Sequence, residues 1–193
     1  MSTRDRIIET ADRLFYQQGF EATSFADIAS AVGISRGNFY HHFKTKDDIL
    51  DAVITQRLAN TEQMLDRWEI SGNDPSERIR SFIHILIVNG EKIRKFGCPV
   101  GTLSSELAKL NHAAQSDAAG LFTLFRSWLC RQFMALGFGA KSDALAMHIL
   151  GRSQGVATLA NAFDDDGFLE SEVTLMCNWL DDQITHLKAS ERA

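Results

Sequence analysis

The chain has 193 residues, and 45% of them are hydrophobic, which is enough to bury a substantial core. Its 20 Lys and Arg side chains are outnumbered by 25 Asp and Glu, so the net charge is −5 at pH 7. This balance argues against a protein that coats nucleic acid or acidic membrane through bulk charge, and any nucleic-acid site must be local. Only two prolines occur, so long stretches lack the breaks that an all-β chain requires. The composition predicts an all-α protein.

Start and stop signals place three short helices at the N-terminus, over residues 3–18, 25–32 and 36–43. Ser24, with Asp27 three residues later, is typical of a helix N-cap, and Ser35 repeats the capping signal before the third helix. Gly33 stands between the second and third helices, where the chain must reverse. This order of signals predicts a helix-turn-helix.

The charge changes sign locally between Gly33 and Lys46. Arg36, Lys44 and Lys46 occur in this segment without any acidic residue, so it carries +3 inside a molecule of −5. Gly37, near the start of the third helix, lets the backbone approach a phosphate or a base edge closely. Helix-turn-helix shapes also occur in proteins that never touch DNA, so these residues alone leave a purely structural role open.

The stretch SFADIASAVGISRGNFYHHFKTKDDIL, residues 24–50, resembles the N-terminal DNA-binding domain of the TetR family of transcriptional regulators. The resemblance extends over residues 3 to about 63. Its most specific part is the aromatic-His-His-Phe ending of the third helix, followed by two lysines and a long fourth helix. It implies an all-α homodimeric regulator of transcription that binds double-stranded operator DNA.

The resemblance also assigns roles to individual side chains. It implies that Thr23, Tyr40 and Lys46 hold phosphates, and that the third helix faces base edges or the adjacent backbone. Tyr40 and Phe43 have an alternative role as packing residues of the small N-terminal domain. The full set of expected DNA contacts is Thr23, Ser35, Arg36, Gly37, Asn38, Tyr40, His41, Lys44 and Lys46.

Six further helices are predicted over residues 45–71, 75–93, 103–110, 112–136, 142–163 and 169–187, which gives about nine in all. The conspicuous interior break is Gly97-Cys98-Pro99-Val100-Gly101. We assign residues 1–48 to a TetR-type helix-turn-helix DNA-binding domain, with its recognition motif at about 24–43. Residues 49–193 are assigned to a ligand-binding and dimerisation domain.

The resemblance implies a mostly apolar pocket for a small-molecule inducer among the helices after Pro75. Most aromatic residues there have the alternative role of plain core, and a core histidine with a satisfied hydrogen bond is the simpler fate of His84. Cys98 is a candidate sensor of electrophiles or oxidants at a helix break, although buried cysteine is commonly inert. The candidate ligand contacts are Phe82, His84, Phe96, Cys98, Phe125, Trp128 and Gln154.

Two glycines four residues apart in the penultimate helix allow a second helix to approach closely. In the TetR family the last two helices of each subunit form the dimer interface, so the resemblance implies the same use here. The alternative is a tight crossing within one chain. The candidate interface residues are Gly151, Gly155, Leu159, Met176 and Leu180.

The charged N-terminus does not have the pattern of a signal peptide, and the longest apolar run, Phe82–Val88, is far below the roughly 18 residues of a membrane span. Three widely spaced cysteines fit neither a disulfide framework nor a zinc site. We expect a cytoplasmic repressor with no catalytic residues, cofactor, metal or membrane partner. The alternatives are an activator, a ligand-independent regulator, or an all-helical enzyme or binding protein that kept the N-terminal domain for packing.

Overall fold

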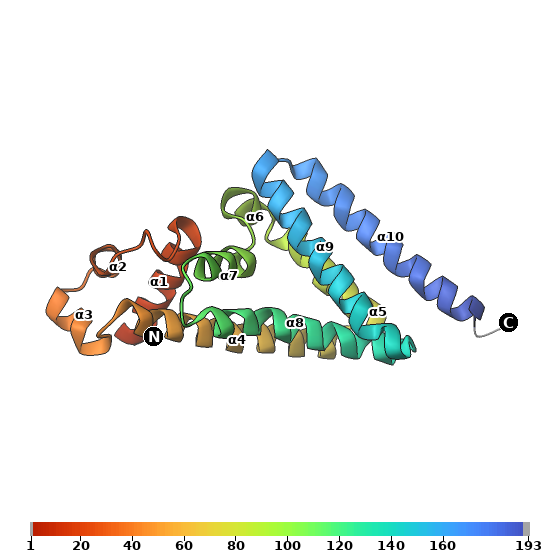
Figure 1. Ribbon diagram of the computed structural model, residues 1–193, viewed down its shortest axis with the longest axis horizontal. Helices are drawn as coiled ribbons and strands as arrows, with labels where there is room; N and C mark the ends of the chain where they lie inside the picture. The colour runs from red at the N-terminus through yellow and green to blue at the C-terminus, as the bar shows by residue number, and fades with distance from the viewer. Residues whose placement is uncertain (1, 191–193) are drawn as a thin grey trace. The chain divides into compact units, whose positions relative to one another are not determined.

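The computed structural model describes residues 2–190, and within this range the regular structure is entirely helical (Figure 1). The N-terminal helices match the predicted ones closely, and the second and third begin at the predicted caps, Ser24 and Ser35. The all-α fold with an N-terminal helix-turn-helix is confirmed. The helices are α1 (Thr3–Gln18), α2 (Phe25–Val32), α3 (Arg36–His42), α4 (Lys46–Ser71), α5 (Pro75–Val88), α6 (Gly90–Phe96), α7 (Pro99–Lys109), α8 (Gln115–Ala135), the short 3-10 helix η1 (Gly139–Lys141), α9 (Ser142–Phe163) and α10 (Asp166–Ser190).

The structure differs from the prediction between residues 75 and 93, where two helices replace the single one expected. Asn89 ends α5 with φ −102° and ψ 10°, and its side-chain amide donates to the carbonyl of Ile85 at 3.1 Å. Gly90 then starts α6 as a buried residue. A Cβ at Gly90 would lie 3.4 Å from a methyl group of Leu169, so α6 packs against α10 at this point.

The chain divides into two compact units. The N-terminal unit contains Met1–Thr61 together with Pro99–Leu121, and the C-terminal unit contains Glu62–Cys98 together with Phe122–Ala193. The helices α4 and α8 each contribute one end to each unit. The N-terminal unit therefore combines the helix-turn-helix with α7, which is distant from it in the sequence.

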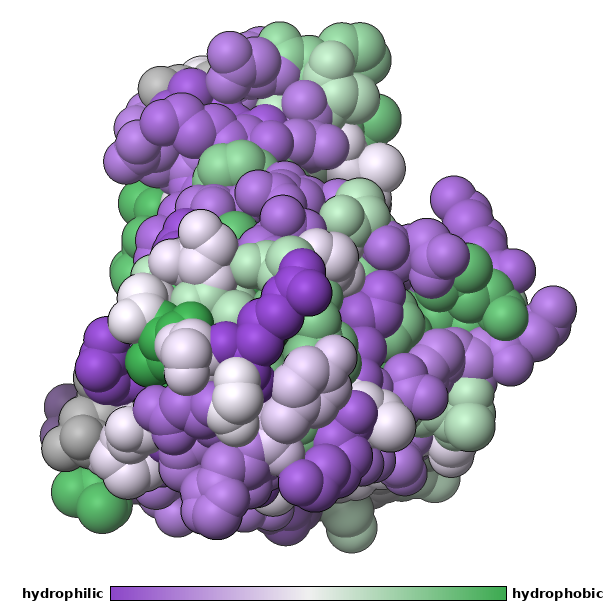
Figure 2. All heavy atoms as spheres, turned by 90° about the vertical axis from the view of Figure 1, so that its left-hand side faces the viewer, coloured by the Kyte–Doolittle hydropathy of each residue, from purple (hydrophilic) through white to green (hydrophobic). Residues whose placement is uncertain are grey.

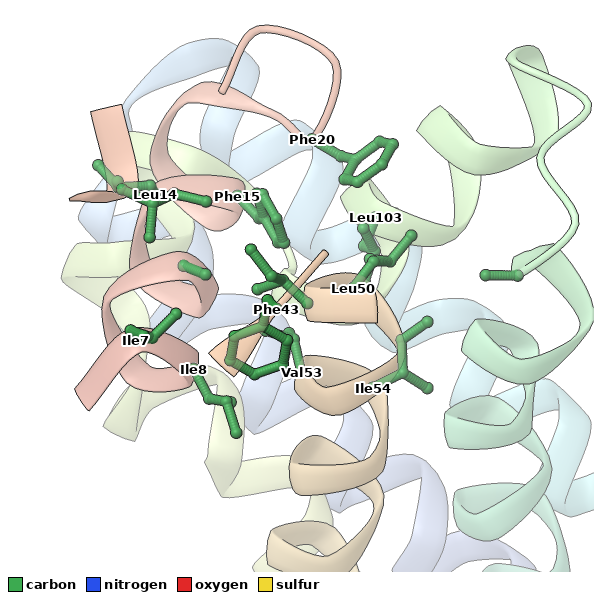
Figure 3. Close-up of a cluster of buried hydrophobic side chains, with 14 of the residues drawn as sticks. Ile7, Ile8, Leu14, Phe15, Phe20, Phe43, Leu50, Val53, Ile54 and Leu103 are labelled. Carbon is green, nitrogen blue, oxygen red and sulfur yellow. The ribbon is translucent and has the colours of Figure 1, made fainter. Parts of the chain in front are cut away.

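One hydrophobic cluster holds the N-terminal unit together (Figure 3). It joins α1, α2 and α3 to the start of α4, to α7 and to the start of α8. Polar contacts add to it, since Arg6 of α1 donates to the carbonyl of Val32 at 2.8 Å. The buried aromatic and larger aliphatic members include Ile7, Ile8, Leu14, Phe15, Phe20, Ile28, Phe39, Phe43, Ile49, Leu50, Leu103 and Leu107.

The C-terminal unit is built around α5, α6, α9 and α10, with α10 packed on α5 and α9 and with α6 packed on α9. Arg80 of α5 pairs with Asp181 of α10, and Arg152 of α9 pairs with Glu172 of α10 at 2.9 Å. Within residues 2–190, no helix combines the length and the apolar character that crossing a membrane requires.

Candidate nucleic-acid interface

Local hydrogen bonds define the turn between α2 and α3. Ser24 caps α2, because its hydroxyl accepts from the amide of Asp27 at 3.2 Å while the Asp27 carboxylate accepts from the amide of Ser24 at 2.8 Å. Gly33 follows α2 in the left-handed conformation, with φ 74° and ψ 38°, which favours glycine. The turn is therefore fixed by a reciprocal cap at one end of α2 and a glycine at the other.

The third helix is anchored by one aromatic face. Phe39 is 1% exposed, and its ring packs against that of Phe25 at a centroid distance of 4.9 Å. Tyr40 is half exposed, and its ring stacks on that of Phe25 at a centroid distance of 5.5 Å and an interplanar angle of 19°. This packing leaves Arg36, Gly37 and Asn38 exposed at the start of α3.

Hydrophilic residues cover most of the face on which α2 and α3 lie (Figure 2). Arg36 and His41 are exposed on α3, and Lys44 follows it with its ammonium group 2.6 Å from the carbonyl of Tyr40. Lys46 is less exposed, since its ammonium group donates to the carbonyls of Phe20 at 3.0 Å and Glu21 at 3.4 Å. The structure thus collects the predicted basic residues around α3 and the start of α4.

Two of the predicted DNA contacts use their side-chain hydroxyls for hydrogen bonds within the protein. Thr23 is fully buried, and its hydroxyl donates to the carbonyl of Gly19 at 2.7 Å. The prediction that Thr23 holds a phosphate is therefore wrong for its side chain in this structure. The hydroxyl of Ser35 is exposed but acts as the N-cap of α3, where it accepts from the amide of Asn38 at 3.3 Å.

A cavity of about 280 Å³ lies between α2 and α3, beside Arg36 and Tyr40. Sequence reasoning missed it, because its floor is made of apolar residues of α2 that the periodicity assigns to packing. The spacing of Phe25, Ala26 and Ala29 could have indicated it, since small residues at these positions leave room beside a large ring. The lining residues are Ser24, Phe25, Ala26, Ala29, Arg36, Phe39 and Tyr40.

Two capping carboxylates make this region sensitive to acid. Hydrogen bonds from the side chain and backbone of Ser24 hold the pKa of Asp27 below its ordinary value of 3.8. Backbone amides of Thr45 and Lys44 likewise lower the pKa of Asp48. Stability from a lowered pKa is present above the unfolded value and is lost as the pH falls through the folded value.

We therefore expect Asp27→Asn to destabilise the protein at pH 7, and the difference from the wild type to disappear below the lowered pKa, under about pH 3.8. The measurement is urea unfolding followed by circular dichroism between pH 2.5 and 7. The control is Asp51→Asn, at an exposed position inside α4 away from any helix start. A difference for Asp27→Asn that stays constant over this pH range would contradict the capping role.

The predicted ligand contacts differ in burial: three are buried, one is exposed and three are partly exposed. Phe82 and Phe125 are buried in the C-terminal unit with their rings edge to face at 5.4 Å, and Trp128 lies 5.6 Å from the ring of Trp68. His84 is exposed, and its Nδ1 lies 2.8 Å from the carbonyl of Arg80. Both expectations for His84, a place in an internal pocket and a buried place in the core, are therefore wrong. Partly exposed positions are occupied by Phe96, Cys98 and Gln154.

The residues predicted to form the dimer interface also differ in burial. Gly151, Gly155 and Leu159 are exposed on α9, and a Cβ added at either glycine would meet nothing within 4 Å. The alternative interpretation, in which these two glycines allow a tight helix crossing within one chain, is therefore wrong. Met176 and Leu180 are fully buried, so their assignment to an interface between chains is also wrong. Their apolar face of α10 is used inside the C-terminal unit.

A capped turn, a buried aromatic anchor and an exposed basic third helix define a helix-turn-helix DNA-binding regulator of transcription. Residues 7–53 match the family described as bacterial regulatory proteins, tetR family. An HTH-type transcriptional regulator in the lacX 3′ region of Lactococcus lactis subsp. lactis is 27% identical over 91% of each chain. The HTH-type transcriptional repressor KstR2 of Mycolicibacterium smegmatis is 28% identical over 60% of this chain and 55% of its own length.

Solved structures agree with these relatives. A TetR transcriptional regulator from Legionella pneumophila has a TM-score of 0.82 and 27% identity, and the match covers 95% of this chain and 97% of that one. The family match, the relatives and the solved structures together support a TetR-family regulator of transcription.

Proposed function

We propose that this protein is a homodimeric repressor, acting in the cytoplasm, that leaves its operator when a small molecule binds to the C-terminal unit. The observation that carries the DNA-binding part is the exposed basic surface of α3, which is held in place by Phe39 and two capped helix starts. Insertion of α3 into the major groove brings Arg36 to base edges and the neighbouring lysines to phosphates.

The direct test is Arg36→Ala, measured by fluorescence anisotropy on an operator selected from random-sequence duplexes. We expect an affinity loss of about 10- to 100-fold, together with relaxed specificity at the base that Arg36 reads. The matched control is Arg13→Ala, which removes the same charge from an exposed position of α1. Equal affinities for the Arg36→Ala and Arg13→Ala variants would contradict the assignment of α3 as the reading helix.

The homodimer is supported by an apolar stripe along α9. Met147, Gly151, Gly155, Leu159 and Phe163 follow one another at intervals of four residues and are all exposed, Phe163 to 71%. A stripe of this kind is unusual on a helix that faces only water, and its two glycines allow close approach of a second helix. A dimer also matches two half-sites roughly 34 Å apart on DNA.

Release by a small molecule is supported by the aromatic cluster of the C-terminal unit. Trp128 is 1% exposed, and its indole N–H has no hydrogen-bond partner among the described residues. A buried donor without an acceptor costs free energy that a bound ligand with an acceptor atom would offset. A ligand releases DNA only through different affinities for the two forms of the protein. Screening compounds for loss of operator anisotropy tests this part, and failure of every binder to release DNA would overturn it.

A further inference from the structure

The peptide segment Phe20–Glu21, which links α1 to α2, is held by charged side chains from two sides. On one side the carboxylate of Glu106, on α7, accepts from the amide of Phe20 at 2.9 Å and from the amide of Glu21 at 2.9 Å. On the other side the ammonium group of Lys46, at the start of α4, donates to the carbonyls of the same two residues. We call this arrangement the Glu106 clasp.

The clasp couples two opposite charges through peptide groups. Hydrogen bonds to ionised groups are stronger than neutral ones, and hydrogen bonds in a chain polarise one another. The amide of Glu21 and the carbonyl of Phe20 belong to one peptide group, so the hydrogen bond of that amide to Glu106 strengthens the carbonyl that Lys46 binds at 3.0 Å. The ammonium group of Lys46 uses two of its three donors in this way and keeps one for a phosphate.

The backbone of this loop is shaped for the clasp. Gly19 has φ +93°, and a Cβ there would lie 3.0 Å from the Oε1 atom of Glu106, so the glycine makes room for the carboxylate. Phe20 is 2% exposed and belongs to the same buried cluster as Leu103 of α7 (Figure 3). The ring of His112 contacts that of Phe20 edge on, at 5.1 Å. The loop is therefore tied to α7 by both packing and hydrogen bonds.

We propose that Glu106 is a positioning residue for DNA binding. Its clasp holds the α1–α2 loop, and with it the start of α2 and the ammonium group of Lys46, in the arrangement that meets the DNA. Since α7 begins at Pro99, directly where the chain leaves the C-terminal unit, a displacement of α7 reaches the helix-turn-helix through this carboxylate. Glu106 itself touches no DNA in this scheme.

The test is Glu106→Gln, compared with the wild type on the selected operator. A glutamine side chain keeps the size but offers one acceptor atom for two amides, so we expect an affinity loss of about 10- to 100-fold. The direction of the change in affinity is decisive. If the clasp played no part, removing the negative charge of Glu106 would strengthen binding to DNA. The control is Glu9→Gln, an exposed position of α1, for which we expect unchanged or slightly tighter binding.

Salt dependence separates positioning from direct contact. The slope of log affinity against log salt should stay unchanged for Glu106→Gln, whereas it should fall by about one for Lys46→Ala. Amide hydrogen exchange provides the structural readout. In the Glu106→Gln variant, one of the two amides loses its hydrogen bond to the carboxylate, so amide exchange at Phe20 or Glu21 should rise at least about tenfold. The amides of Ile28 and Leu50 should stay protected.

Three outcomes would overturn the proposal. Affinity of the Glu106→Gln variant equal to that of Glu9→Gln would show that the clasp does not affect binding. A slope lowered by one would show that a phosphate contact has been lost. Faster exchange at Ile28 and Leu50 to the same extent would show general unfolding. None of these outcomes depends on the inducer or on the dimer.

Discussion

Leu159→Glu should convert the proposed dimer into monomers and weaken operator binding by about 10²- to 10⁴-fold, because two linked DNA-binding domains gain this much over one. Leu159 is 44% exposed, so the substitution leaves the core of the C-terminal unit intact. In a dimer, however, it places a carboxylate inside an apolar contact, where an unpaired charge is costly.

Light scattering at micromolar concentration gives the mass, and anisotropy on the full operator gives the affinity. The control is Ile70→Glu, which places the same carboxylate at a position of α4 that is 86% exposed. A wild-type protein with the mass of a monomer would contradict the dimer itself. A Leu159→Glu protein that stays dimeric would show that the contact lies on another face.

Phe39→Ala should abolish measurable operator binding. Truncation of a fully buried phenylalanine costs about 3–5 kcal/mol, and Phe39 at 1% exposure joins α3 to α2 through the ring of Phe25. Loss of this anchor detaches the reading helix from its support. Phe39 and Phe25 both belong to the N-terminal unit, so the substitution removes no contact inside the C-terminal unit.

Thermal unfolding followed by circular dichroism reports the stability, and anisotropy reports the binding. Phe39→Leu is the matched control, since it keeps most of the apolar volume and should retain most of the affinity. If Phe39→Ala bound the operator as tightly as Phe39→Leu, the aromatic anchor would not be what holds α3 in its reading position.

Local signals explain why the N-terminal helices could be predicted from the sequence. Ser24 and Asp27 form the predicted reciprocal cap, and Gly33 adopts the left-handed conformation that the turn requires. These signals act over three or four residues, so no long-range contact can override them easily. The missed break between α5 and α6 had a signal too, because Asn89-Gly90 is a typical turn dipeptide.

Tertiary contacts decide the cases in which sequence reasoning failed. Helical periodicity identifies an apolar face but does not tell whether that face meets the same chain or another one. Met176 and Leu180 proved to be buried, whereas Leu159 proved to be exposed. The prediction for Thr23 was wrong for a similar reason, since its hydroxyl donates to the carbonyl of Gly19, an acceptor that only the folded loop provides.

The concentration of positive charge around α3 has a consequence for how the protein searches a genome. Arg36, Lys44 and Lys46 supply +3 in a chain of net charge −5, so most of the surface repels the duplex. Binding to random sequence rests on phosphate attraction alone, and this repulsion shortens each unproductive encounter. Correct base contacts add affinity at the operator only. The net negative charge of the rest of the protein thus raises the ratio of specific to non-specific binding. This ratio matters when about 10⁶ or more competing sites are present.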